Sequence, residues 1–325
     1  MLQRFAEKVL PTAGTAAQPS AAEAALQRAA AAVLAAAPTP VPGSIGGDWA
    51  VLGLARAGAD VPAGYYADYY DAVAAHVRDC QGVLHERKYT EYSRTILALS
   101  AIGCDARDVA GYDLTLPLGD YEKTVRQGIN GPVWALLALD SRDYPMPQDP
   151  QAKTQATRQR YVDCILAAQR EDGGWSMTDG PSDPDMTAMA LQALARYQAQ
   201  ENVGAAVRRG LACLSALQAS DGGFVSQGMP GAESCAQVLV ALGELGVPAD
   251  DARFVKPGGS VLDALLRYQL ADGGFCHTAG GERNEMASEQ ALYALAAQQR
   301  AANGEDSLYR MSGAPALCAR PAAAA

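Results

Sequence analysis

Residues 169–175 read QREDGGW, and the same pattern returns as QASDGGF at 218–224 and as QLADGGF at 269–275. The aromatic residues that end the three copies lie 49 positions apart (175 to 224) and 51 positions apart (224 to 275). That spacing is roughly the length of two helices and two connections. A fixed period in this range is typical of repeat architectures, in which each supersecondary unit stacks on its neighbours.

Each signature has the composition of a tight turn. The Asp side chain can bond the backbone that it turns, and the glycines adopt backbone angles that other residues avoid. We expect the following aromatic residue to fill the gap between two layers of helices. The leading Gln is expected to hydrogen-bond across the turn. These features predict structural turns rather than a phosphate-binding loop.

Apolar segments with helical spacing follow the signatures, and an alignment on their closing Ala-Leu exposes weaker copies upstream. The six inner-helix candidates are IGGDWAVLGL from Ile45, TEYSRTILAL from Thr90, NGPVWALLAL from Asn130, DMTAMALQAL from Asp185, ESCAQVLVAL from Glu233 and MASEQALYAL from Met286. Outer-helix candidates lie at about 21–36, 66–79, 155–169, 205–217 and 260–269. The 3.6-residue periodicity of both sets favours an all-helical fold.

Charge and hydropathy exclude several kinds of partner. The 325 residues carry a formal net charge of −10, whereas nucleic-acid binding needs clustered Lys and Arg. No stretch of about 18 apolar residues is present, so the sequence predicts no membrane span. The first residues, MLQRFAEKVLPTAG, lack the apolar core of a secretory signal, which predicts a cytoplasmic chain as written.

The seven cysteines are scattered along the chain, and no two of them form a CxxC pair. This pattern indicates neither a disulfide framework nor a zinc ribbon. We expect most of the cysteines to be small buried side chains.

The repeat signature carries a family likeness. QREDGGW resembles the QW-type repeat of squalene and terpene cyclases and the related prenyltransferase and squalene-oxidase repeats. DPDMTAMALQAL at 183–194 is similar to the α-domain of transcobalamin and intrinsic factor. The resemblance covers about 40–310 and implies an all-α (α/α)6 toroid of about six helical hairpins. We therefore expect one toroid domain at 21–310, a partly flexible segment at 1–20 and a disordered tail at 311–325.

The same resemblance suggests which chemistry to look for. Protein prenyltransferases hold zinc with an Asp-x-Cys pair, which this chain lacks, so that activity is rejected and no metal is expected. Class II terpene cyclases protonate their substrate with the middle Asp of an Asp-x-Asp-Asp-Thr motif. The matching residues 183–187 read DPDMT, which implies Asp185 as general acid and Asp183 as its partner, with Met186 in place of the third Asp. Alternatively, Asp185 or Thr187 caps an inner helix.

The N-termini of six parallel inner helices would line one rim of the barrel. Aromatic, amide and carboxylate groups on an apolar wall are typical of a small-molecule site. The acids at this rim disfavour an anionic ligand, and Arg94 is expected to pair with one of them. The candidate ligand-binding residues are Trp49, Tyr89, Glu91, Tyr92, Arg94, Asn130, Trp134, Thr187, Met189, Glu233, Gln237, Ser288 and Gln290.

Three functions are compatible with this pattern. The first is a non-catalytic binder of a bulky apolar small molecule, either a corrinoid (cobalamin) or an isoprenoid, in the barrel mouth. In the corrinoid binders a second, β-rich domain closes over the ligand, so that role implies such a partner. The second is a class II terpene-cyclase-like isomerase that uses Asp185. The third is a protein-interaction module, because a fold alone does not fix a function.

Overall fold

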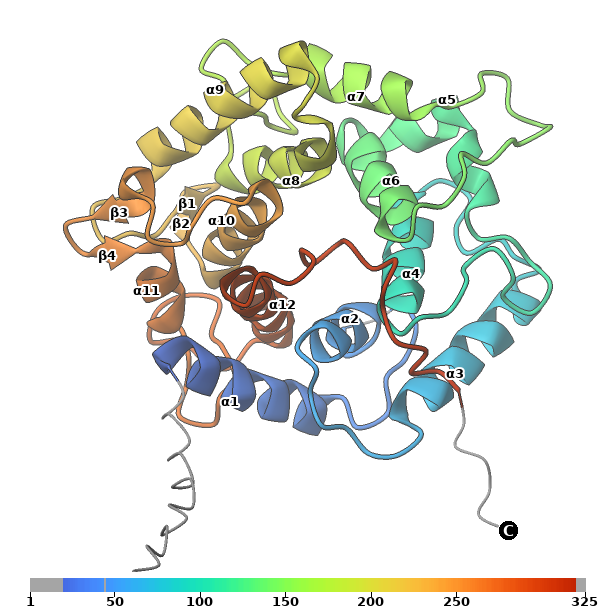
Figure 1. Cartoon of the computed structure of the whole chain (residues 1–325), viewed down its shortest axis with the longest axis horizontal. Coiled ribbons are helices and arrows are strands. Elements are labelled where there is room, and N and C mark those ends of the chain that lie inside the picture. Colours follow the sequence, from blue (N-terminus) through green and yellow to red (C-terminus); the bar gives the residue numbers. More distant parts are fainter. Residues whose placement is uncertain (1–19, 44, 320–325) are drawn as a thin grey trace, which may run out of the picture.

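The computed structural model describes residues 20–43 and 45–319. In that part of the chain, six helices form a closed inner ring in which each helix contacts the next and the last contacts the first (Figure 1). They are α2 (Asp48–Arg56), α4 (Thr90–Ala101), α6 (Asn130–Ser141), α8 (Pro184–Leu194), α10 (Ala232–Leu245) and α12 (Glu285–Ala302). The predicted all-α toroid is confirmed.

A second layer of helices surrounds the inner ring. It consists of α1 (Ala21–Ala36), α3 (Tyr65–Asp79), α5 (Tyr121–Thr124), α7 (Arg158–Ala167), α9 (Glu201–Leu217) and α11 (Val261–Leu266). The helix α1 packs on α12 and α2, so the first outer helix closes the ring onto the last inner one. Between α4 and α6, where the sequence offered no outer-helix candidate, the chain forms only the short α5 between two 3-10 turns, Leu116–Gly119 and Val125–Gln127.

Short irregular elements connect the longer helices. Two antiparallel hairpins of two-residue strands precede inner and outer helices of the last repeats: β1 (Val225–Ser226) with β2 (Met229–Pro230), and β3 (Val255–Lys256) with β4 (Gly259–Ser260). Further 3-10 turns lie at Ala195–Tyr197 and Ala252–Phe254. No helix within 20–43 and 45–319 is both long and apolar enough to cross a bilayer.

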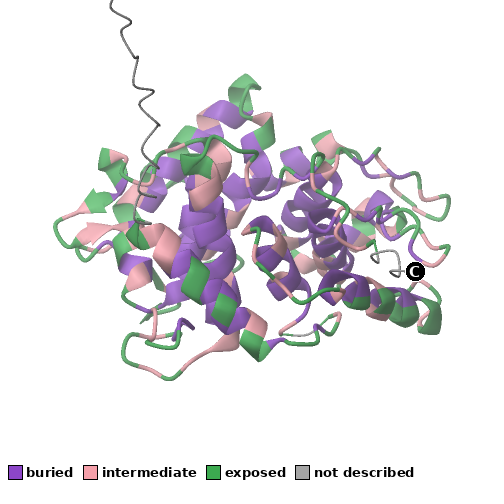
Figure 2. Ribbon diagram, turned by 60° about the horizontal axis from the view of Figure 1, so that its bottom comes forward, coloured by how far each residue is buried: buried purple, intermediate pink, exposed green. Residues whose placement is uncertain are grey.

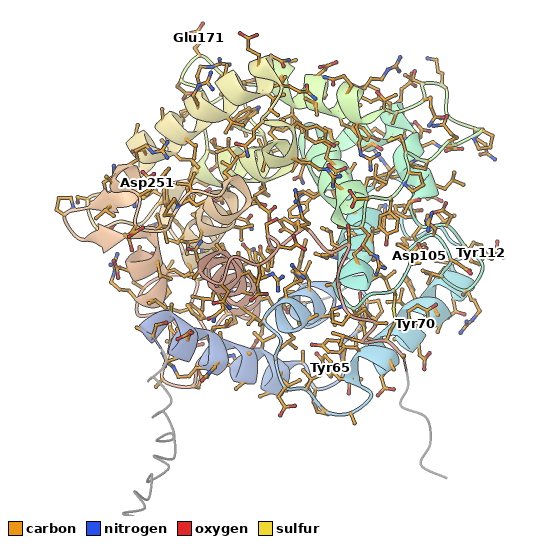
Figure 3. All side chains as sticks on the ribbon, in the orientation of Figure 1. Tyr65, Tyr70, Asp105, Tyr112, Glu171 and Asp251 are labelled. Atoms are coloured by element: carbon orange, nitrogen blue, oxygen red, sulfur yellow. A yellow bond between two sulfur atoms is a disulfide. The ribbon has the colours of Figure 1, made fainter. Side chains whose placement is uncertain are left out.

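The inner helices are buried on almost every side. In α6, all residues from 131 to 139 are buried, as expected for a helix enclosed by two inner neighbours and an outer layer. Figure 2 shows the buried residues concentrated along these helices, with exposed residues on the loops and outer helices. Side chains fill the centre of the ring, whereas Glu171, Asp251 and Tyr112 lie at its outer edge (Figure 3).

The DGG signatures form the turns that the sequence predicts. In the first copy, the Asp172 carboxylate accepts the Gly174 N–H at 3.1 Å. Gly173 has φ +89°, and a Cβ there would lie 2.7 Å from the Arg209 carbonyl oxygen. Glycine is therefore required by backbone angle and by the close approach of α9. The second and third copies repeat this geometry, with φ +90° at Gly222 and +91° at Gly273.

The leading Gln of each signature joins neighbouring repeats. Gln169 Nε2 donates to Gly173 O in its own turn and to Ala206 O in α9, both at 2.8 Å. Gln269 Nε2 donates to Gly273 O at 3.2 Å and to Ala25 O in α1 at 2.9 Å. The last signature therefore hydrogen-bonds to the first helix. The expected hydrogen bond across the turn is confirmed, and its second acceptor ties the repeats together.

The segment that follows α12 crosses the C-terminal ends of the inner helices (Figure 1). Leu308, Tyr309 and Met311 are buried, and Cys318 forms a disulfide with Cys104. The expectation of a disordered tail is therefore corrected for residues 311–319, while 320–325 lie outside the described residues. The disulfide is a second departure from expectation, because the spacing of these two cysteines along the chain gives no sign of pairing.

Candidate functional site at the N-terminal rim

The fifth positions of the six aligned inner segments are occupied by Trp49, Arg94, Trp134, Met189, Gln237 and Gln290. The rings of Trp49 and Trp134 lie 5.2 Å apart although α4 stands between their helices in the ring, and Gln237 Nε2 donates to Gln290 Oε1 at 2.9 Å. These two contacts join residues at the same aligned position of different inner helices, as expected for inner helices that run in the same direction.

Aromatic side chains close the centre of the barrel below this rim. Tyr293 lies 5.9 Å from Trp49, and Tyr309 from the C-terminal segment lies 6.4 Å from Trp134, between ring centroids. Asn130 orients the Trp134 indole by accepting its N–H at 3.0 Å. Gln237 also donates to the Tyr293 hydroxyl at 2.6 Å. Two of the three tryptophans of the chain thus share one site with two tyrosines.

Asp183, and not Asp185, caps helix α8. Its Oδ1 accepts the N–H groups of Asp185 and Met186, each at 3.0 Å, and its Oδ2 accepts the Ser226 hydroxyl at 2.6 Å. The hypothesis that Asp185 or Thr187 caps the helix is therefore wrong. Asp183 is therefore the residue that caps α8, and Asp185 does not contribute to the cap.

The carboxyl group of Asp185 is largely buried. Its Oδ1 is buried and has no hydrogen-bond partner among the described residues. Burial raises the pKa of the Asp185 carboxyl, the Asp183 and Glu233 carboxylates raise it further, and the Ser234 and Ser226 hydroxyls oppose the rise. A carboxyl group in this environment favours its protonated form.

Glu233 is the counterpart of Asp185 in the next repeat, and it has a partner. Its two carboxylate oxygens lie 2.9 and 2.8 Å from Nδ1 of His277, which is half-exposed in the loop before α12. The His277 carbonyl accepts the N–H of Ala232 at 3.1 Å, which fixes this loop on the start of α10. Among the described residues, the rim therefore holds the Asp185 carboxyl, which has no ion-pair partner, and a carboxylate–imidazole pair.

Arg94 forms an ion-pair network on the opposite side of the rim. Its Nε lies 2.7 Å from Asp48, and its Nη2 lies 2.5 Å from Glu91. The Tyr69 hydroxyl donates to the second oxygen of Asp48, which is fully buried. The expectation that Arg94 pairs with a rim carboxylate is confirmed, and Glu91 serves as one of its partners.

Four predicted ligand-binding residues lie between the helical layers instead. Thr187 and Ser288 are fully buried, and their hydroxyls accept the backbone N–H of Trp175 at 2.9 Å and of Phe275 at 2.8 Å. Tyr89 and Tyr92 are also buried, with ring centroids 5.4 Å apart. The hydroxyls of Thr187 and Ser288 thus hold the signature turns, and the ligand-binding role of all four residues stays a prediction.

Three residues of the site were missed from the sequence. They are Asp48 and Glu289, at the fourth aligned position of the first and last segments, and Tyr293, at the eighth position of the last. Glu289 is buried, and its Oε1 accepts the Gly46 N–H at 2.5 Å. All three residues are present in the aligned segments. Acidic and aromatic residues one position before or three positions after position five could therefore have identified them as site residues.

Glu289 predicts an unusual pH dependence of stability. Burial raises the pKa of its carboxyl to about 7, Glu285 and Asp48 add to the rise, and the Gly46 N–H and Arg94 oppose it. From its ordinary value near 4.5 up to about 7, the folded chain holds a proton that the unfolded chain has lost. Stability therefore falls as pH rises through this window, by about 3 kcal/mol in total.

The isosteric variant Glu289→Gln is expected to remove this contribution to the pH dependence. Urea unfolding at pH 5 and pH 8 should show a clearly smaller loss of stability in the variant than in the wild type, and the raised pKa values of Asp185 and Glu244 account for the loss that remains. Glu282→Gln, at a neighbouring exposed acid, is the control and should follow the wild type. If Glu289→Gln also follows the wild type, the Glu289 carboxyl does not carry the pH dependence.

The rim has no arrangement that favours a metal. Within the described ranges, no group of three or more His, Cys, Asp or Glu side chains could hold a metal ion. The available chemistry is acid–base chemistry by Asp185 and Glu233, next to aromatic ring faces.

No protein-family model matches the chain. No curated protein matches it either. Among solved structures, an unsaturated glucuronyl hydrolase from Bacillus sp. GL1, responsible for the degradation of glycosaminoglycan, is similar with a TM-score of 0.58 and 14% identity, over 90% of this chain and 99% of that chain.

Two further structures are similar. A type II terpene cyclase from Scytonema gives a TM-score of 0.55 at 14% identity, over 86% of this chain and 97% of that chain. A protein from Actinoplanes gives 0.50 at 17% identity, over 86% and 99%. At these identities the likeness shows the α/α-toroid fold alone. The likeness to terpene cyclases is thus confirmed for the fold, and the likeness to prenyltransferases and transcobalamin stays a prediction.

Proposed function

We propose that the N-terminal rim is the active site of an enzyme that transfers a proton from Asp185 to a carbon–carbon double bond of an uncharged, isoprenoid-like substrate. The observation that carries this proposal is the buried Asp185 oxygen without a hydrogen-bond partner, on a carboxyl whose pKa is raised. A carboxyl group whose surroundings favour its protonated form can act as a general acid.

The charges at the rim favour an uncharged substrate. Arg94, Arg283 and His277 each pair with a carboxylate, at 2.7, 3.1 and 2.8 Å. The two guanidinium groups therefore have carboxylate partners before any substrate arrives, and His277 is hydrogen-bonded to Glu233. The name of the unsaturated glucuronyl hydrolase indicates an acidic sugar, whereas a terpene cyclase acts on a hydrocarbon chain. The rim of this chain fits the second substrate class better.

The aromatic centre suits the charge that such a reaction creates. The Asp185 O–H bond breaks, the π electrons of the double bond form a new C–H bond, and a cation develops at the other carbon. The ring faces of Trp49 and Trp134 stabilise a cation through their quadrupoles. Attack by a second double bond and loss of a proton from a neighbouring carbon give an isomer. Glu233, oriented by His277, is our candidate base for that last step.

The contact between Trp49 and Trp134 argues against a corrinoid. Rings 5.2 Å apart close the space between α2 and α6, where so large a ligand would need an open mouth. We therefore do not extend the transcobalamin likeness to the ligand.

Incubation with neutral linear isoprenoids in D2O tests the proposal. The wild type should convert squalene or geranylgeraniol to an isomer that carries deuterium bound to carbon, detected by gas chromatography and mass spectrometry. Asp179→Asn, an exposed acid in the loop before α8, should behave as the wild type. An isoprenoid that is retained but recovered unlabelled would instead support the non-catalytic binder.

A further inference from the structure

The C-terminal segment, residues 303–319, covers the end of the barrel opposite the N-terminal rim (Figure 1). Its backbone donates hydrogen bonds to the ends of two inner helices. The Met311 N–H donates to the Ser141 carbonyl of α6 at 2.6 Å, and the Leu317 N–H donates to the Ile102 carbonyl after α4 at 2.9 Å. The segment therefore closes this end of the barrel.

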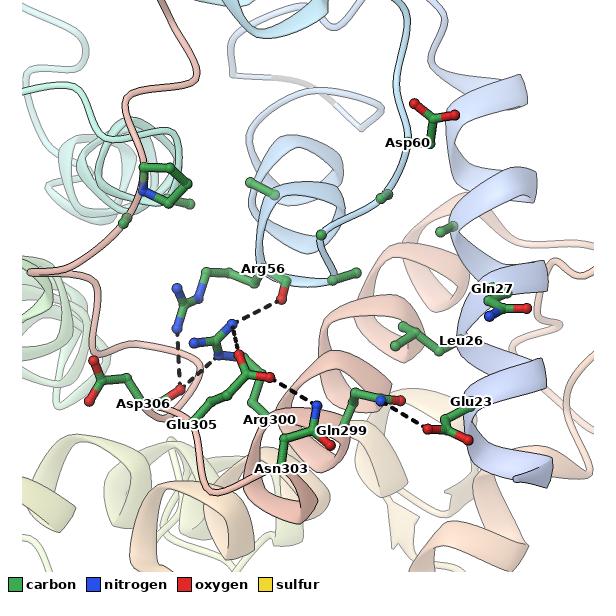
Figure 4. Close-up of a pocket in the computed structure, with 18 of the residues that line it drawn as sticks. Glu23, Leu26, Gln27, Arg56, Asp60, Gln299, Arg300, Asn303, Glu305 and Asp306 are labelled. Carbon is green, nitrogen blue, oxygen red and sulfur yellow. Dashed lines mark hydrogen bonds and ion pairs between the residues drawn. The ribbon is translucent and has the colours of Figure 1, made fainter. Parts of the chain in front are cut away.

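Two charged side chains hold the segment on both sides of Tyr309. Glu244 of α10 accepts the Tyr309 N–H at 3.0 Å and the Ser307 hydroxyl at 2.7 Å. Arg56, at the end of α2, is 6% exposed, and its Nη2 donates to the carbonyl oxygens of Ser307 and Arg310 at 2.8 and 3.1 Å. Figure 4 shows Arg56 beside a cavity of about 1210 Å³ that lies between this segment and α1. The backbone around Tyr309 is thus fixed independently of its side chain.

A smaller cavity of about 250 Å³ lies between this segment and the C-terminal ends of α6, α8 and α10. Two of its lining residues also contact the rim site. The Tyr309 ring lies 6.4 Å from that of Trp134, between centroids. Gln192 Nε2 donates to the Gln237 side chain at 3.0 Å. The cavity therefore lies below the rim site, and about 10 Å along the axis of α8 separates Gln192 from Asp185.

The wall of the smaller cavity is polar and carries no net charge. It contains as many acidic as basic side chains, namely Asp140, Glu244, Arg196 and Arg310. Asp140 pairs with Arg158 at 2.7 Å, and Arg196 pairs with Asp143. Amide, hydroxyl and small apolar side chains complete the wall. Such a lining favours an uncharged polar group over an ion.

Two oxygens of the residues that line this cavity have no hydrogen-bond partner among the described residues. They are Gln192 Oε1 and the Tyr309 hydroxyl, on residues that are 2% and 3% exposed. Buried polar groups without partners are rare, because each has lost its hydrogen bonds to water. A hydroxyl group that donates to Gln192 and accepts from Tyr309 would satisfy both oxygens.

We propose that this cavity binds the hydroxyl end of an isoprenoid alcohol whose double bond lies at Asp185. The inference rests on the proposed function and narrows its substrate class from uncharged isoprenoids to alcohols. A volume of about 250 Å³ is below the usual range of complete ligand pockets, so it suits one end of a longer molecule. The chain between the two ends passes Trp49 and Trp134.

Titration calorimetry on the Asp185→Asn variant measures this binding without turnover. The probes are farnesol and geranylgeraniol, each with its methyl ether and with the hydrocarbon in which hydrogen replaces the hydroxyl, below their solubility limits. At least one alcohol should bind about ten times more tightly than its own hydrocarbon, because both buried oxygens gain a partner. The ether accepts but cannot donate, so its affinity should be intermediate. Equal affinity within both pairs, or no binding of either alcohol, would overturn the proposal.

Tyr309→Phe, in the same Asp185→Asn background, locates the hydroxyl end. The variant removes a hydroxyl that has no partner in the protein, so the fold should be retained. Affinity for the alcohol should fall about threefold, and affinity for the hydrocarbon should not change. Tyr66→Phe is the matched control, because the Tyr66 hydroxyl is also buried without a partner but belongs to α3 in the outer layer. Unchanged affinity for the alcohol in Tyr309→Phe would show that the proposal is wrong.

The labelled products distinguish this inference from the proposed function. If the alcohol binds through Tyr309 but the wild type forms no deuterium-labelled isomer, the cavity binds the hydroxyl and the proposed proton transfer is wrong. If the wild type labels squalene, which has no hydroxyl, as efficiently as geranylgeraniol, the proton transfer is supported and the role of the cavity is wrong.

Discussion

Asp185→Asn is expected to lower turnover of the isoprenoid substrate about a thousandfold, within the range that a positioned general acid contributes. The amide has the shape of the carboxyl group but cannot release a proton to carbon. Substrate binding should change little, because the aromatic and amide side chains of the rim are untouched. The fold should also be retained, since Asp183 caps α8 and Asp185 accepts no capping hydrogen bond.

A variant of the neighbouring Asp183 distinguishes an effect on catalysis from an effect on stability. Asp183→Asn should lower stability by about 1 kcal/mol, through the weaker cap and the lost Ser226 contact, with a smaller effect on turnover. Thermal midpoints and steady-state rates measured together distinguish the two outcomes. The pH profile gives a second check: because the pKa of Asp185 is raised, turnover should fall as pH rises through that value. Full activity in Asp185→Asn would show that Asp185 is not the proton donor, and Glu289 would be the next candidate.

Helical periodicity predicts which residues of an inner helix share a face, so part of the rim could be predicted from the sequence. Positions one and five of the aligned segments lie four residues apart, so they share a helix face, and Asp185 and Met189 both reach the rim. Position three is rotated about 200° from position five. Thr187 and Ser288 therefore face the outer layer, where they bond the signature turns. The alignment gives the height of these two residues along the helix but not this rotation.

Contacts between distant segments could not be predicted in this way. The burial of Tyr309 beside Trp134 joins the C-terminal segment to α6, and no repeat pattern covers that segment. The pairing of Cys104 with Cys318 depends on the same crossing of the barrel end. The cavity that holds Arg56 also forms only when this segment meets α1 and α2. Local periodicity determines the layers, whereas these features depend on how the chain ends meet.

Trp175→Ala is expected to lower the free energy of unfolding by about 4 kcal/mol, as truncation of a fully buried aromatic does. The indole lies between α7, α8 and α9: its N–H donates to Ile165 O at 2.7 Å, and a Cβ at Gly210 would lie 2.9 Å from its ring. The variant leaves a cavity at this junction and an unpaired carbonyl. Urea unfolding measures the loss, and a loss below about 1 kcal/mol would contradict the role of the aromatic as the filler between layers.

Trp175→Phe is the matched variant, because Phe224 and Phe275 occupy the same place in the following repeats. It keeps most of the buried area and loses the Ile165 hydrogen bond, so a cost of about 1–2 kcal/mol is expected. Gly210→Ala should be costly in the wild type, where its methyl would meet the indole and Leu191. In the Trp175→Phe background the smaller ring gives room, so the two costs should sum to more than the cost of the double variant. If the cost of the double variant equals the sum of the two single costs, the Trp175 ring does not limit the approach of α9. Glycine at position 210 would then be required only by the contact with Leu191.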